Sequence, residues 1–218
     1  MSVTRFCRER LITLISNAAS GFGRIVSASF SVPAGSIAAN GAKPSAMTQA
    51  VSILTRIHTP DILRHLVALP AEDRWLRFGH SISPAALKYY VHEIDLSRDQ
   101  ALGVYDPDHA LIGFTHIAVD QPSGCAELAI SVLPEHRRRG LGVAMLRRAL
   151  QHAADLGLDR VCAHFRAENL PVLKLARKAG FDVATHGCEG LASKQIAESV
   201  LPLSPFARQP ARIFIKTE

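Results

Sequence analysis

The stretch from Glu127 to Gly142 constrains the fold more than any other part of the chain. The alternating apolar residues 126–132 predict a strand that ends just before Pro134. The basic, glycine-containing turn Arg137-Arg-Arg-Gly-Leu-Gly142 follows, and the pattern of residues 143–156 predicts an amphipathic helix directly after it. Glycine lets a ligand approach the backbone closely, and a helix N-terminus offers unpaired N–H groups and a positive dipole end. This order of elements therefore predicts a site for a phosphate or another anion.

The overall composition describes one globular domain with a basic surface. The 218 residues are 48% hydrophobic, and the length is enough to bury a sizeable core. The net charge of +6 favours nucleic acid, an anionic surface or a polyphosphate cofactor as partner, without choosing among them. The four cysteines, at positions 7, 125, 162 and 188, lack zinc-type spacing, so we expect reduced thiols, no metal site and a cytoplasmic protein.

Residues 1–46 differ in character from the rest of the chain. They are rich in Ala, Ser and Gly, and Arg24 is the only charged residue between Leu11 and Ala42. We expect a disordered tail or a translation start that was assigned too early, with Met47 as the true first residue. A targeting peptide is a third interpretation, although the apolar run after the first arginines is short and interrupted. The domain itself is expected to span residues 47–218.

Periodic patterns after Met47 predict alternating strands and helices. Residues 100–105 and 111–119, separated by a polar turn, predict an antiparallel hairpin that residues 126–132 extend. Further strands are predicted at 51–57, 160–165, 181–185 and 211–216, and further helices from Pro60 and at 72–78, 84–91 and 171–178. The polar link 187–210 gives no clear pattern.

The glycine turn fits two common nucleotide motifs poorly. Met145 stands where a dinucleotide fingerprint has its third glycine, and no Lys-Ser or Lys-Thr pair follows a glycine as in an NTPase loop. The plain alternative is a helix N-terminus with a solvated basic face.

Two segments together resemble the GNAT superfamily of acyl-CoA-dependent N-acyltransferases. Residues 137–142 fit that family's Gln/Arg-x-x-Gly-x-Gly/Ala signature, and residues 169–181, which begin with Asn169 and end in Gly180-Phe181, resemble its second hallmark. The resemblance covers about residues 53–181. It implies an α+β, three-layer fold with a mixed, mostly antiparallel central sheet and helices on both faces. At finer detail, the chain resembles the acetyltransferase domains of bacterial protein lysine acetyltransferases. This resemblance lies at Arg77-Phe78, Tyr90, residues 93–95 and residues 126–132.

The resemblance also implies a cofactor site for acetyl-CoA, the acyl donor. In the family, main-chain amides of the turn hold the coenzyme A diphosphate, which assigns this role to Arg137, Arg138, Arg139, Gly140, Leu141 and Gly142. The backbone of Ile130 and Val132 would align the pantetheine arm as if it were an added strand, and Asn169 would bond to the arm.

Transfer of the acetyl group needs a base for the attacking amine. The resemblance makes Glu127 the first candidate, because related lysine acetyltransferase domains carry a catalytic carboxylate there. His164 is the second, since it stands five residues before Asn169, where the family's ribosomal-protein acetyltransferases have a glutamate. Either side chain could instead be structural. Ala176 occupies the place of the family's general-acid tyrosine, and Tyr89, Tyr90 and His116 are possible substitutes.

The leading hypothesis is thus an N-acetyltransferase that acts on a primary amine, either a protein lysine or a small molecule. Residues 72–95 and 187–210 are expected to form the acceptor pocket. A non-catalytic acyl-CoA sensor is the alternative, supported mainly by Ala176. Nucleic acid and membrane partners are not expected, because no interleaved aromatic and basic surface or spanning segment is predicted. The sequence leaves the oligomeric state open.

Overall fold

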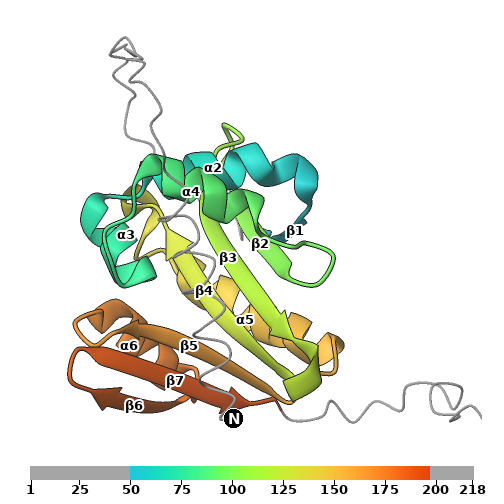
Figure 1. The fold of residues 1–218 in the computed structure, drawn as a ribbon, viewed down its shortest axis with the longest axis vertical. Coiled ribbons are helices and arrows are strands. Elements are labelled where there is room, and N and C mark those ends of the chain that lie inside the picture. The colour runs from blue at the N-terminus through green and yellow to red at the C-terminus, as the bar shows by residue number, and fades with distance from the viewer. Residues whose placement is uncertain (1–49, 197–218) are drawn as a thin grey trace, which may run out of the picture.

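The computed structural model describes residues 50–196, which form a seven-stranded sheet in the order β1-β2-β3-β4-β5-β7-β6 (Figure 1). All neighbouring strands are antiparallel except β4 and β5, which are parallel. The strands are β1 (Ser52–Leu54), β2 (Gln100–Tyr105), β3 (Leu111–Asp120), β4 (Cys125–Val132), β5 (Arg160–Arg166), β6 (Asp182–His186) and β7 (Glu189–Gln195). The predicted mixed, mostly antiparallel sheet is confirmed.

Helices cover both faces of the sheet, as predicted for a three-layer fold (Figure 1). They are α2 (Thr59–Ala68), α3 (Ala71–Phe78), α4 (Pro84–His92), α5 (Leu141–Asp155) and α6 (Leu170–Lys178), with short 3₁₀ turns at Arg56–His58, Gln121–Ser123 and Pro134–His136. Side chains of α2 and α4 pack with Phe114 of β3 in one apolar cluster. Those of α5 pack with Ile117 and Leu128 in another cluster. Successive residues of β3 and β4 therefore contribute to opposite layers.

The parallel pairing between β4 and β5 is short. Only residues 125–127 of β4 pair with β5, through residues 160–162. Beyond that point the two strands separate, although β4 pairs with β3 over its whole length and β5 pairs with β7 over its whole length. Since each strand is held by its other neighbour, the gap between residues 128–132 and 163–166 is part of the fold.

Two predicted strand assignments change. The strand predicted at 51–57 ends at Leu54, because Thr55 caps a 3₁₀ turn and its N–H donates to His58 Nδ1 at 2.9 Å. Residues 181–185 do form the strand β6, but its hairpin partner is β7, which lies in the link that gave no clear pattern. The strand predicted at 211–216 and the tail 1–46 lie outside the described residues. Among residues 50–196, no helix is long and apolar enough to cross a membrane.

His65 of α2 is buried against the sheet and connects two of its strands. Its Nδ1 donates to the Leu111 carbonyl at 2.8 Å, and its Nε2 accepts from the Ser131 hydroxyl at 2.9 Å. This arrangement satisfies both ring nitrogens of a neutral imidazole. Burial lowers the pKa of His65 to about 4.

We expect His65 to make folding sensitive to acid. Between pH 6.5 and about 4 the unfolded chain binds a proton at this position and the folded chain does not. Lowering the pH through this window therefore decreases the free energy of unfolding by about 3 kcal/mol. Urea unfolding measured at several pH values checks this, and His65→Asn should flatten the slope. His109→Asn is the control, because His109 is exposed and its φ of 60° suits asparagine. An equal slope in the His65 variant contradicts the assignment.

Candidate active site

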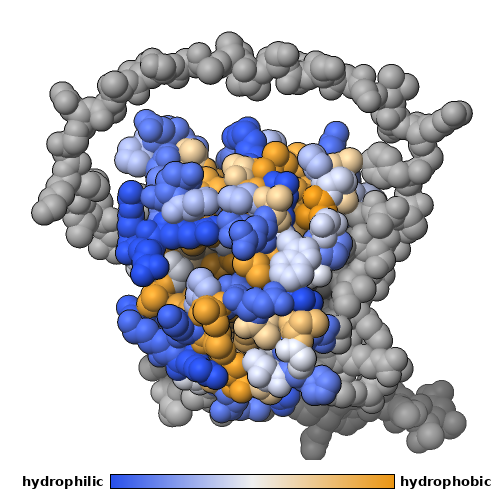
Figure 2. All heavy atoms as spheres, turned by 90° about the vertical axis from the view of Figure 1, so that its left-hand side faces the viewer, coloured by the Kyte–Doolittle hydropathy of each residue, from blue (hydrophilic) through white to orange (hydrophobic). Residues whose placement is uncertain are grey.

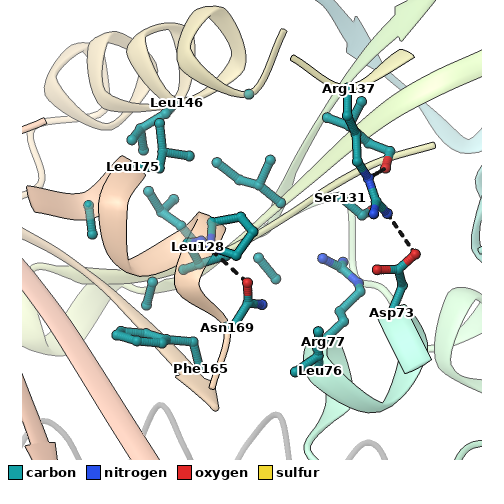
Figure 3. A pocket seen from close by; sticks show the side chains of 18 of the residues that line it. Asp73, Leu76, Arg77, Leu128, Ser131, Arg137, Leu146, Phe165, Asn169 and Leu175 are labelled. Atoms are coloured by element: carbon teal, nitrogen blue, oxygen red, sulfur yellow. Dashed lines mark hydrogen bonds and ion pairs between the residues drawn. The ribbon is translucent and has the colours of Figure 1, made fainter. Parts of the chain in front are cut away.

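A cavity of about 660 Å³ occupies the gap between β4 and β5 (Figure 3). Residues 128–132 and 163–165 form its strand walls, while α3, the basic turn and the first turns of α5 and α6 close the other sides. Figure 2 shows apolar side chains in the hollow between the hydrophilic upper and lower parts of this side of the molecule. The cavity is therefore an apolar channel with a few polar groups, which is typical of cofactor sites.

The basic turn contains backbone N–H groups that have no acceptor among residues 50–196. Arg138 and Gly140 both have positive φ, 60° and 83°, and α5 begins immediately after them. The Arg137 amide donates to the Pro134 carbonyl, but within the described chain no acceptor is found for the amides of residues 138–143. These amides, together with the helix dipole, are suited to an anion.

Gly142 leaves space beside these amides. A Cβ placed there would meet only Leu175 Cδ2, at an ordinary contact distance of 3.8 Å. Glycine destabilises a helix by about 1 kcal/mol relative to alanine. At this position neither close packing nor a positive φ requires a glycine. An open space above unpaired amides fits the close approach of a diphosphate.

The side chain of Arg137 is already engaged within the protein. Its Nε donates to the Val132 carbonyl at 2.9 Å, and its Nη2 pairs with Asp73 Oδ2 at 2.7 Å (Figure 3). Arg137 therefore ties the end of β4 to α3, and two of its three guanidinium nitrogens already have partners within the protein. Of the three arginines, Arg137 and Arg138 line the cavity and Arg139 does not.

The other predicted cofactor residues also lie at the cavity. The lining includes Ile130, Val132, Gly140, Leu141, Gly142 and Asn169. Asn169 caps α6, because its Oδ1 accepts from the Val172 amide at 3.3 Å (Figure 3). Its side-chain NH₂ group is left to donate elsewhere.

The two predicted bases, Glu127 and His164, form a pair. His164 Nδ1 lies 3.0 Å from Glu127 Oε1. The Glu127 side chain is only 3% exposed, whereas that of His164 is 26% exposed and lines the cavity. Because an ionised carboxylate only accepts, Nδ1 carries the proton and Nε2 has the free lone pair. The sequence treated these residues as alternatives, but the geometry places His164 at the cavity and Glu127 behind it.

A second polar network was only partly foreseen. The Tyr90 hydroxyl lies 2.8 Å from His116 Nδ1, and His116 Nε2 lies 3.3 Å from Asp99 Oδ2. All three side chains are almost completely buried, none lines the cavity, and burial raises the pKa of Tyr90. Asp99 was not a candidate, since an aspartate in a polar turn carries no sequence signal of burial. Ala176 lines the cavity, so the family's tyrosine position contributes no hydroxyl there.

The predicted acceptor segments contribute unequally to the cavity. Asp73, Leu76 and Arg77 of α3 line it, whereas Ala192 is the only lining residue from the described part of 187–210. Of the two segments expected to form the acceptor pocket, 72–95 thus contributes more of the cavity lining, through α3.

Comparison with solved structures shows the fold. The GNAT domain of S. lividans PAT is 18% identical, with a TM-score of 0.60 over 66% of this chain and 89% of that one. A phosphinothricin acetyltransferase from Sinorhizobium meliloti, solved in complex with AcCoA, is 18% identical, with a TM-score of 0.58 over 76% of this chain and 95% of that one.

Comparison of sequences leads to the family. A mycothiol acetyltransferase of Clavibacter sepedonicus is 40% identical over 77 residues, which are 35% of this chain and 25% of that protein. The chain thus matches about a quarter of the length of this curated relative. The model of the "Acetyltransferase (GNAT) family" matches residues 69–181, which include the basic turn, the Glu127–His164 pair and Asn169. Because this match covers more than half of the sequence, the chain belongs to the acetyltransferase (GNAT) family.

Proposed function

We propose that this protein is an acetyl-CoA-dependent N-acetyltransferase that transfers the acetyl group to a primary amine. The observation that carries the proposal is the cavity between β4 and β5, because the basic turn and His164 both border it and Glu127 pairs with His164 from behind. The family to which the chain belongs uses acetyl-CoA. The acceptor is a protein lysine, as the resemblance to bacterial protein lysine acetyltransferases suggests, or a small amine.

The residues of the cavity divide the binding of acetyl-CoA among them. The amides of residues 138–143 take the diphosphate, and Gly142 gives it room. The edge of β4 beyond Glu127, which has no strand partner on the β5 side, takes the pantetheine arm along Ile130 and Val132. The thioester then lies in the apolar channel, where dipoles act more strongly than in bulk water.

The pair of His164 and Glu127 supplies the proton transfer. The amine nitrogen attacks the thioester carbonyl carbon, the carbon–sulfur bond breaks, and coenzyme A leaves as a thiolate. His164 Nε2 takes the proton from the amine, and Glu127 stabilises the imidazolium through Nδ1. Because Ala176 has no proton to give, water protonates the thiolate, which an alkyl thiol with a pKa of about 8.5 allows.

Isothermal titration with acetyl-CoA, followed by an assay of free thiol release with a panel of amines and peptides, tests the proposal. Binding together with amine-dependent thiol release is expected. Binding without release for any acceptor would favour a sensor domain. No heat with acetyl-CoA, combined with a salt-sensitive affinity for DNA, would remove the cofactor assignment altogether.

We expect Gly142→Glu to abolish acetyl-CoA binding without unfolding the protein. The new side chain enters open space, but it places a negative charge where the diphosphate binds. Gly142→Ala should raise the free energy of unfolding by about 1 kcal/mol and weaken binding by a smaller factor. Calorimetry and urea unfolding check both variants. Lys174→Glu is the charge control, because Lys174 is exposed on α6 and does not line the cavity. Wild-type affinity in both Gly142 variants would exclude the turn from the site.

We expect Glu127 and His164 to act as one unit. His164→Ala should lower kcat by roughly 100-fold, the usual contribution of a general base, and Glu127→Gln should lower it by a smaller factor. The double variant should be no slower than His164→Ala, because Glu127 acts through the imidazole. Steady-state kinetics of the three variants check this, with acetyl-CoA affinity as the control. Independent, multiplying losses would show that Glu127 acts directly on the amine.

A further inference from the structure

Arg77, in the last turn of α3, carries a buried guanidinium at the edge of the cavity. Its side chain lines the cavity and extends from α3 toward Ser131 (Figure 3). All three guanidinium nitrogens are inaccessible to solvent, and none has a hydrogen-bond partner of normal geometry among the described residues. The partial exposure of the residue therefore belongs to its aliphatic part, and the Tyr90 oxygen faces its N–H donors outside normal hydrogen-bond geometry.

The surroundings of this guanidinium stabilise its charge only in part. Its central carbon lies 5.4 Å from the centroid of the Phe78 ring and 5.5 Å from that of Phe114. The Tyr90 oxygen interacts with it electrostatically, which opposes the lowering of the pKa of Arg77 by burial. Within the described chain, no carboxylate forms an ion pair with Arg77.

A buried guanidinium that has only a neutral hydroxyl oxygen nearby, without normal hydrogen bonds or an ion pair, is costly, so a further acceptor would stabilise it. A carboxylate is the natural one, because its two oxygens match the planar fork of a guanidinium.

The position of Arg77 relative to the catalytic pair indicates which molecule brings the carboxylate. Arg77 of α3 and His164 of β5 line the same cavity, and Glu127 lies behind His164. A molecule that carries an amine and a carboxylate would present its cationic end to Glu127 and His164 and its anionic end to Arg77. The two protein charges have the signs that such a zwitterion requires.

We propose that Arg77 is the specificity-determining residue of the acceptor site and binds a carboxylate of the acceptor, which makes the acceptor an amino acid or a similar small amino-carboxylate. This inference rests on the proposed N-acetyltransferase function, and it selects the small-molecule acceptor over the protein lysine.

The test compares acceptors that differ only in the carboxylate. The full chain is assayed with acetyl-CoA and a panel of amino acids, each paired with its carboxamide. At least one amino acid should exceed its amide in kcat/KM by roughly 10- to 100-fold, the usual effect of a charge-assisted hydrogen-bonded pair. Arg77→Met should remove this preference by raising KM for the amino acid much more than KM for the amide, and should leave the affinity for acetyl-CoA unchanged.

A stability measurement supplies a readout that does not depend on activity. Without ligands, Arg77→Met should increase the midpoint of urea unfolding, because methionine removes an unpaired buried charge and keeps most of the packing. Arg64→Met is the control, since the Arg64 side chain is 72% exposed, and no change is expected. Destabilisation by Arg77→Met would overturn the inference, because it would mean that the chain itself already compensates the charge.

The other outcomes separate this inference from the function on which it rests. If the wild-type protein binds acetyl-CoA and acetylates amides or peptides as well as amino acids, or accepts no amino-carboxylate, the Arg77 inference fails and the N-acetyltransferase proposal stands. If Arg77→Met weakens the binding of acetyl-CoA, Arg77 belongs to the cofactor site instead. If the wild-type protein binds no acetyl-CoA, the proposed function fails first.

Discussion

The three-residue parallel contact between β4 and β5 is the constraint on which the rest of the structure depends. Each strand keeps a full-length antiparallel partner on its other side, so the separation after Glu127 is built into the sheet. This separation opens the cavity and leaves one edge of β4 without a strand partner inside the fold. A free strand edge favours an extended ligand, and the amides of the basic turn lie at the end of that edge.

Helix α3 bridges the gap that the strands leave. Asp73 pairs with Arg137, next to the end of β4, and the Trp75 ring lies under the guanidinium of Arg166, at the end of β5, at 4.5 Å. A helix of only eight residues thus contacts both separated strands and also presents Arg77 to the cavity. The cofactor turn and the acceptor side share this helix, so a displacement of α3 by one ligand would change the contacts made with the other.

Local patterns predicted most of the fold, and they failed where burial does not depend on apolar side chains. Strand β7 was not recognised because its residues are small or polar, and Gly190 fits under the Phe165 ring where a Cβ would come within 2.5 Å of ring carbons. Glu127 and His164 were both found, but their pairing depends on the register between β4 and β5. Arg77 was named only within the resemblance of Arg77-Phe78 to lysine acetyltransferase domains, because the sequence does not show that α3 faces a cavity.

The buried network behind Arg77 explains how its charge can stay available. Asp99 accepts from His116 Nε2, which leaves Nδ1 to accept the proton of the Tyr90 hydroxyl, so every donor in the series points toward Asp99. The lone pairs of the Tyr90 oxygen are then left for the guanidinium, which is held by a neutral oxygen and two aromatic rings. A carboxylate in that position would have neutralised Arg77 within the chain. In the Asp99–His116–Tyr90 series, the carboxylate of Asp99 is separated from Arg77 by two side chains. The core therefore positions the Arg77 guanidinium without neutralising it, and its charge is available to a ligand.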